Sequence, residues 1–269
     1  MTKFELVLLG YPIFVILAGG YGIRMNDWIK ERYGDKPKVL LPFGAEGEPI
    51  LLYNLRNCME IGRPENIYVA TVLQEIEDYV KGVDIRINVI REPQDGKDPR
   101  TNIGRGGAMS YSVERRLLPE RDIITVNAVD LCPVSSIQEM ASCKGSGFLV
   151  AKRYYSEMPG SNLPNVVYYR NGVITGIQRE KYEISDGTGL HTGISRIGLD
   201  DFYRLRNIQK GEETEDTIFM QIMREGRLRV VGPIETWLPL KIPQHVIDCK
   251  SVYIEDFRKT GFIKKAPEH

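Results

Sequence analysis

The feature that most constrains this chain is a short apolar run that ends directly in small residues. Ile13–Leu17 contains β-branched and aromatic residues and has the length of a buried strand. The segment 18–22, AGGYG, follows without a linker. Small residues after a strand let the backbone lie close to a ligand, with N–H groups available for an anion. The glycines predict either an anion site or a plain tight turn, and alone they do not decide between the two.

Two cations follow this turn in the sequence. Arg24 would bring a forked set of donors that suits phosphate oxygens, and Lys38 enters the next apolar run, 39–41. Backbone donors, a guanidinium and an ammonium at one strand end are what a triphosphate needs. The pattern is not a P-loop, because no Gly-Lys-Ser/Thr follows, and its spacing differs from the dinucleotide fingerprint.

The first 130 residues alternate between strand and helix patterns. We expect helices at 49–61 and 74–80 and strands at 67–72, 84–90 and 123–130. This order predicts an α/β fold with a doubly wound, mostly parallel mixed sheet, Rossmann-like, that binds ligands at the carboxyl ends of its strands. The second half predicts strands at 147–154, 165–169, 173–178 and 227–231, and helices at 199–208, 217–224 and 251–260. Asn171-Gly172 marks a hairpin turn in that half.

Composition excludes several classes of partner. Lys+Arg and Asp+Glu both number 36, so we expect no nucleic-acid partner and no anionic membrane surface. The apolar N-terminal run is interrupted by Glu5, Gly10 and Pro12, and no run reaches transmembrane length. Cysteines without metal or disulfide spacing fit a reducing, cytoplasmic setting. They are Cys58, Cys132, Cys143 and Cys249.

The motif Leu17-Ala18-Gly19-Gly20-x-Gly22-x-Arg24, followed by Pro37-Lys38-x-Leu40-Leu41-Pro42, resembles the start of the sugar-1-phosphate nucleotidyltransferases. Those enzymes make NDP-sugars from an NTP and a sugar 1-phosphate. The resemblance implies a GT-A-like nucleotidyltransferase domain over 1–269. Its nucleotide-binding half would span about 1–130, and its sugar-phosphate half about 131–269.

The resemblance also implies roles for the residues of this motif. The nucleotide would be bound by Leu17, Ala18, Gly19, Gly20 and Gly22. Arg24 would neutralise the leaving pyrophosphate, and Lys38 would bridge the α-phosphate and the attacking phosphate.

A second glycine-rich segment, 102–109, opens the helix that we expect to run to about Leu117. Glycines at a helix N-terminus suit either a close ligand or tight helix packing. The segment resembles the family's Gly-Thr-Ala-Gly-Ala stretch, which borders the nucleobase and sugar. That implies Gly104 and Gly106 as nucleotide-binding residues, with Arg105 where the family usually has Thr.

Two acids are candidate Mg²⁺ ligands. From its position alone, Asp130 at a strand end suits either a metal or the cap of the next helix. By resemblance it is the family's metal-binding Asp. The family's second metal ligand follows a Trp, but Trp237 is followed by Leu238 and Pro239, so Asp248 fits that role better. Asp248 read alone could equally be an ordinary turn acid.

The acceptor side depends on two segments. Glu180-Lys181, after the predicted hairpin, reads alone as a solvated strand end. By resemblance to the family's Glu-Lys-Pro, Glu180 would bind sugar hydroxyls and Lys181 the sugar phosphate. Gly193 lies in a segment that resembles the lining of the sugar pocket, and His191 stands there in place of an Asn. A lone His is more often a core residue than a catalyst.

These residues together predict Mg²⁺-dependent transfer of a nucleotidyl group to a sugar 1-phosphate, with glucose 1-phosphate and mannose 1-phosphate as the first candidates. Cytidylyl- and guanylyltransferases for inositol, choline or molybdenum-cofactor acceptors share the N-terminal motif and stay open. So does a non-catalytic regulatory homologue. Relatives are often dimers or tetramers, so a homo-oligomer is one expectation. The nucleobase is not predicted.

Overall fold

A computed structural model of the chain describes residues 11–20, 25–93, 104–155, 163–208 and 214–267. Its main sheet has the strand order β5-β4-β1-β6-β11-β8-β12-β10-β9. In chain order these strands are β1 Ile13–Leu17, β4 Ile67–Thr71, β5 Asn88–Arg91, β6 Ile123–Asn127, β8 Gly147–Tyr154, β9 Asn165–Arg170, β10 Val173–Arg179, β11 Thr188–Ile197 and β12 Arg229–Pro239. The predicted α/β fold with a mixed sheet is confirmed.

The helices of the described part, α, 3₁₀ and π together, are α2 Asn26–Tyr33, η2 Lys38–Leu40, α3 Ile50–Ile61, η3 Pro64–Asn66, α4 Gln74–Val83, α5 Gly104–Glu114, α6 Val134–Ser142, η4 Leu199–Asn207, η5 Glu215–Phe219, α7 Met220–Arg224, α8 Pro243–Cys249 and α9 Ile254–Thr260. Within that part, no helix combines the length and the apolar composition that crossing a membrane requires.

The nucleotide half predicted from sequence forms the parallel side of the sheet. β1 pairs in parallel with β4 on one side and with β6 on the other, and β4 pairs with β5. β1 is buried over most of its length, which is why its sequence is an uninterrupted apolar run. The carboxyl ends of these four strands therefore meet at one edge, where a ligand site is expected.

The other side of the sheet is mixed. β11 runs antiparallel to β6, β8 and β9, while β12 runs parallel to β8. β9 and β10 form the expected hairpin, with Asn171 at φ 52° and Gly172 at φ 76° in its turn. Two residues with positive φ are what a type I′ turn requires, and Asn-Gly supplies them with little strain. The turn prediction is confirmed.

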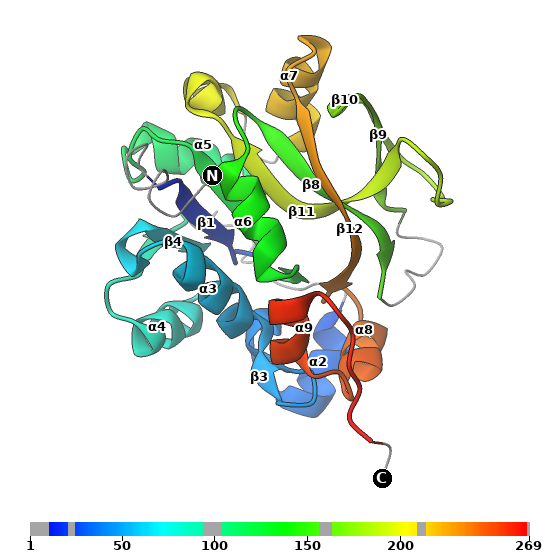
Figure 1. The fold of residues 1–269 in the computed structure, drawn as a ribbon. Helices are drawn as coiled ribbons and strands as arrows, with labels where there is room; N and C mark the ends of the chain where they lie inside the picture. Colours follow the sequence, from blue (N-terminus) through cyan, green and yellow to red (C-terminus); the bar gives the residue numbers. More distant parts are fainter. Residues whose placement is uncertain (1–10, 21–24, 94–103, 156–162, 209–213, 268–269) are drawn as a thin grey trace.

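Helices cover both faces of the sheet (Figure 1). Apolar side chains of α3, α4 and α6 pack into one core, which includes Leu55, Val80 and Ile137. α5, η4 and α7 pack on the opposite face, where Met109 and Phe202 are buried. The sheet is thus the middle layer of three, as doubly wound folds require.

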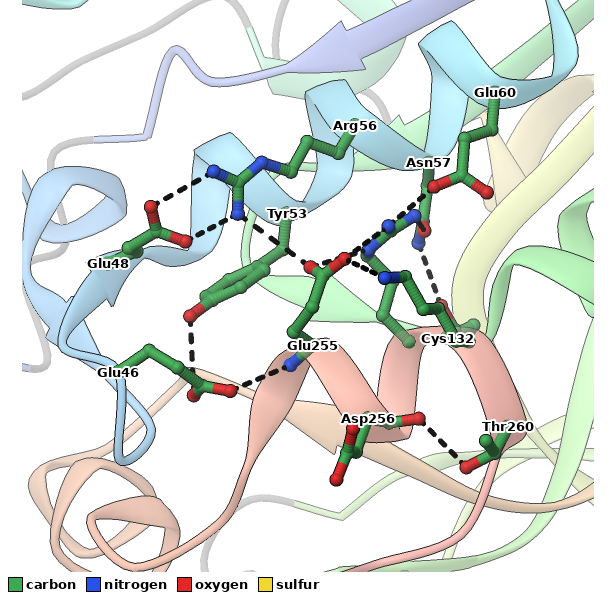
Figure 2. Close-up of polar contacts among 12 residues, drawn as sticks. Glu46, Glu48, Tyr53, Arg56, Asn57, Glu60, Cys132, Glu255, Asp256 and Thr260 are labelled. Carbon is green, nitrogen blue, oxygen red and sulfur yellow. Dashed lines mark hydrogen bonds and ion pairs between the residues drawn. The ribbon is translucent and has the colours of Figure 1, made fainter.

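A third core lies at one end of the molecule, where α2, α8 and α9 gather near a small hairpin (Figure 1). The hairpin strands are β2 Pro42–Phe43 and β3 Glu48–Pro49. α9 is fastened to this hairpin and to α3 by the polar contacts shown in Figure 2. Glu46 accepts backbone N–H bonds from Ile254 at 2.9 Å and Glu255 at 3.1 Å, so it caps the N-terminus of α9.

Arg258 is the buried centre of the α3–α9 contact. Its guanidinium donates to Asn57 at 3.0 Å and forms ion pairs with Glu60 at 2.5 Å and Glu255 at 2.6 Å. Arg56, which is more exposed, lies between Glu48 and Glu255 (Figure 2). The planar fork of an arginine suits several acceptors at once, so these contacts hold the two helices in one arrangement.

Several predicted elements differ from the structure, among them the helix expected at 217–224, which is a π-helix up to Phe219. The strand expected at 84–90 begins only at Asn88, because α4 continues to Val83 and Asp84 then pairs with Arg86 in a turn. The strand expected at 123–130 ends at Asn127, and Asp130 belongs to β7 Asp130–Leu131, which pairs with β12. The strand expected at 227–231 extends to Pro239, and the helix expected at 199–208 is 3₁₀.

Candidate functional site

The candidate site is a cavity at the carboxyl ends of the parallel strands. Its volume is about 170 Å³, and it is partly open to solvent. It is lined by Leu17, Ala18, Gly19, Gly20, Lys38, Val39, Glu92, Arg105, Ala108, Asn127 and Val129. Five of the predicted site residues are among these, namely Leu17, Ala18, Gly19, Gly20 and Lys38.

Backbone hydrogen bonds carry the sheet pattern one residue past the strand ends. Ala18 N donates to Ala70 O at 2.8 Å, and Ala128 N donates to Leu17 O at 3.2 Å. On the next strand Glu92 N donates to Thr71 O at 3.0 Å. These bonds fix where the three loops leave the sheet, so the floor of the cavity is rigid.

Lys38 reaches the cavity from a separate segment. It is the first residue of η2, whose next residues, Val39 and Leu40, are buried in the core. The apolar residues anchor the 3₁₀ turn and leave the partly buried lysine at the cavity wall. Arg105 supplies a second cation from α5 and donates to Asn127 Oδ1 at 3.4 Å.

Glu92 is a functional candidate that sequence reasoning missed. It follows β5 directly, lines the cavity and is 6% exposed. Burial raises the pKa of its carboxyl from 4.5 to about 7. A Cβ on Gly19 would lie 2.4 Å from Glu92 Oε1, so the glycine provides the room that the carboxylate occupies. The available signal was an acid close to the carboxyl end of a predicted strand, as for Asp130.

Asp130 lies beside the cavity with its carboxylate fully buried. Asn127 Nδ2 donates to Oδ2 at 3.1 Å, and Trp237 Nε1 donates to Oδ1 at 3.2 Å. The Lys241 ammonium lies 3.2 Å from the same Oδ1. The predicted Asp130 and Trp237 therefore meet, and Lys241 joins them as a residue that no local pattern indicated.

Gly193 packs against this carboxylate. It has φ +81°, and a Cβ there would lie 2.5 Å from Asp130 Oδ2 and 2.4 Å from Asn127 Nδ2. Only glycine fits both the backbone conformation and the space. His191, two residues earlier, is buried, stacks on Phe148 and bonds to Ser195 Oγ, as a core histidine would.

The oxygens of Asp130 and Asp248, the two expected metal ligands, already have donors bound to them. Asp130 has no exposed surface, and three donors already contact its two oxygens. Asp248 lies on α8, where Gln244 Nε2 donates to its Oδ1 at 2.6 Å. Across the described ranges, no group of three or more His, Cys, Asp or Glu could hold a metal. Mg²⁺ with its waters does not fit Asp130 as the side chains stand.

The remaining predicted residues lie elsewhere. Glu180 follows β10 and accepts a hydrogen bond from the Tyr168 hydroxyl, and Lys181 is exposed beside it. Neither lines the cavity. Gly104 begins α5 and Gly106 is buried within it. Gly22 and Arg24 lie outside the described residues.

Neither a protein-family model nor a curated protein sequence matches this chain. Solved structures do. The inositol-1-phosphate CTP transferase from T. maritima has a TM-score of 0.65 at 16% identity and covers 87% of this chain and 91% of its own. A Bacillus anthracis protein described as a putative glucose-1-phosphate thymidylyltransferase has a TM-score of 0.65 at 18% identity, and the match covers 88% of this chain and 93% of that one. An apo UDP-glucose pyrophosphorylase has a TM-score of 0.64 at 15% identity, and the match covers 89% of this chain and 97% of that one. This chain therefore has the fold of these nucleotidyltransferases.

Proposed function

We propose that this protein transfers a nucleotidyl group from an NTP to a sugar 1-phosphate. An oxygen of the phosphate monoester attacks the α-phosphorus, the bond from the α-phosphorus to the bridging oxygen breaks, and pyrophosphate leaves. The observation that carries the proposal is the cavity itself, in which small residues after β1 lie with Lys38 at the carboxyl ends of parallel strands. The shared fold with nucleotidyltransferases supports it.

Reactions of this type depend on positioning and charge stabilisation, and they need no protein nucleophile. In the proposal, Gly19, Gly20 and Gly22 offer backbone donors to the phosphates. Lys38 bridges the α-phosphate and the attacking phosphate, and Arg24 neutralises the leaving pyrophosphate. Mg²⁺ would enter as part of the MgNTP substrate. Asp130 and Asp248 are the ligands that the sequence predicts for it, but the donors around Asp130 leave the ion no room there as the side chains stand.

The acceptor belongs to the second half of the chain in this proposal. Glu180 and Lys181 would contact the sugar and its phosphate, and Gly193 would border them. Glucose 1-phosphate and mannose 1-phosphate are the first candidates. A second candidate acceptor is inositol 1-phosphate, which is favoured by the likeness to the inositol-1-phosphate CTP transferase.

The test is pyrophosphate release with Mg²⁺, with the common NTPs set against a panel of sugar 1-phosphates and inositol 1-phosphate. Release that requires one NTP and one phosphate ester together would support the proposal. Nucleotide binding without release on any ester would favour another acceptor. Absence of both binding and release would favour a regulatory homologue.

Lys38→Ala tests the proposed site within this assay. Removing one charge that stabilises the transition state typically costs about 10²- to 10³-fold in kcat. Lys36→Ala is the matched control, because Lys36 is exposed two residues earlier and does not line the cavity. Equal turnover in the two variants would contradict the role of Lys38.

A further inference from the structure

The cation nearest to Asp130 is part of the chain. Lys241 Nζ lies 3.2 Å from Asp130 Oδ1, with the acid side chain 0% exposed and the lysine side chain 25% exposed. No part of Asp130 is exposed to solvent. A divalent ion could therefore bind its carboxylate only by displacing one of its present donors, and Lys241 is the donor that carries a positive charge.

Several contacts hold Lys241 in this position. Leu240 N donates to Val129 O at 2.7 Å, which ties the segment to a residue that lines the cavity. Lys241 N donates to His245 Nδ1 at 3.1 Å. The ammonium also lies 5.5 Å from the centre of the Trp237 ring, and that ring donates its own N–H to Asp130. The backbone at Lys241 is thus held by Val129 and His245, and the ammonium is directed to Asp130.

Both oxygens of the Asp130 carboxylate have bonding partners. Asn127 and Trp237 supply neutral donors, and Lys241 supplies the charge. Charged groups inside proteins are stable when they are paired and hydrogen-bonded, and this pair meets both conditions. An ammonium has three donors, so Lys241 can hold Asp130 and still present N–H groups to an anion on its exposed side.

We propose that the Lys241 ammonium takes the place of a metal ion at Asp130 and is the permanent positive charge beside that carboxylate. The divalent ion of the proposed reaction then arrives only with the nucleotide, and that part alone rests on the proposed function. Lys241 is thereby a positioning residue for Asp130.

The test uses Mn²⁺ as a spectroscopic probe of nucleotide-free protein, with free and bound Mn²⁺ measured by electron paramagnetic resonance. The wild-type chain is expected to bind no stoichiometric Mn²⁺. Lys241→Met is expected to gain one bound Mn²⁺ per chain, and adding Asp130→Asn is expected to remove it. Lys264→Met is the matched control, since Lys264 also pairs with a carboxylate, Asp256, and lies over an aromatic ring, Tyr253. It should behave as wild type.

One Mn²⁺ bound per chain in the wild type, lost on Asp130→Asn, would overturn the proposal. So would a folded Lys241→Met that gains no Mn²⁺. If Lys241→Met does not fold, the wild-type measurement still decides, and Lys241→Arg, which keeps the charge, should bind no Mn²⁺. None of these measurements requires nucleotidyl transfer, so a silent substrate panel would refute the proposed function and leave this inference intact.

Discussion

The pKa values of two glutamates in two regions of this molecule are shifted in opposite directions. Burial in the cavity raises the pKa of Glu92 to about 7. At the α3–α9 contact, a hydrogen bond from Arg258, supported by Lys259, lowers the pKa of Glu255 to about 2 (Figure 2). The side chains are chemically identical, so the difference comes from whether a cation bonds directly to the carboxylate.

The comparison separates a structural region from a site. Around α9, carboxylates and guanidiniums are paired, so their charges stabilise the fold. In the cavity, Glu92 is buried without an ion pair among the described residues, and its ionised form costs stability. Shifts of this kind gather at functional sites, because binding and catalysis use groups whose pKa burial has moved from its ordinary value.

The largest expected effect is at Glu92. Its folded pKa lies above the unfolded value of 4.5, so its contribution to stability is present below pH 4.5 and is lost as the pH rises through 7. Glu92→Gln should therefore be more stable than wild type by about 3 kcal/mol at pH 8 and equal to it near pH 4. Urea unfolding at several pH values measures this. Glu139→Gln, on an exposed face of α6, should show no such pH-dependent gain.

Replacing Arg258 should have the opposite effect, because it should lower the stability of the fold. Arg258→Met removes a buried cation that serves Asn57, Glu60 and Glu255, and we expect a loss of about 2 to 3 kcal/mol, because the acids left behind can still be hydrated. Arg56→Met is the control within the same contact. Its side chain is 35% exposed, so its loss should stay below about 1 kcal/mol. Equal losses would mean that burial does not distinguish the two arginines.

Gly19→Ala tests whether the missing side chain at Gly19 provides the space that the Glu92 carboxylate occupies. A Cβ at Gly19 would meet the Glu92 carboxylate at 2.4 Å, whereas a Cβ at Gly20 would meet nothing within 4 Å. We expect Gly19→Ala to cost about 2 kcal/mol through overpacking and Gly20→Ala to cost little. Combining Gly19→Ala with Glu92→Ala should recover most of the loss. If it does not, the glutamate is not the obstacle.

The smallest effect is expected at Glu255. Its folded pKa lies below 4.5, so its stabilisation is present above pH 4.5 and is lost as the pH falls towards 2. The side chain is 30% exposed, which screens the pairing, so Glu255→Gln should cost only about 1 kcal/mol at pH 7. Unfolding at pH 7 and pH 3 measures the difference, which should shrink at the lower pH. A constant difference would contradict a role for its charge.

The sequence predicted those parts of the fold and the site that depend on local patterns. The apolar run Ile13–Leu17, the Asn171-Gly172 turn and the strand Gly147–Tyr154 lie where their patterns place them. The sequence also indicated that the glycines after β1 and Lys38 would lie together, because the end of a buried strand is recognisable in sequence. Gly19, Gly20 and Lys38 do line one cavity.

What the sequence did not predict depends on contacts between distant residues. Lys241 meets Asp130 across more than 100 residues, and no motif announces that pairing. Glu92 becomes unusual only because the fold buries it against Gly19. The strand after residue 227 was predicted too short because its far end pairs with β7, which exists only in the folded chain.

The fastening of α9 to the small hairpin has a consequence for how the protein is made. The hairpin begins at Pro42, shortly after Lys38. The hydrogen bonds that hold it run from Ala45 N to Val252 O and from Ile254 N to Glu46, and the second pair is 208 residues apart in the sequence. During translation, Lys38 and the hairpin leave the ribosome long before Val252 and Ile254, which hold the hairpin, have been made. The hairpin can be fastened only after residue 255 has emerged, so partly synthesised chains are expected to form the parallel strands before the hairpin is held in place.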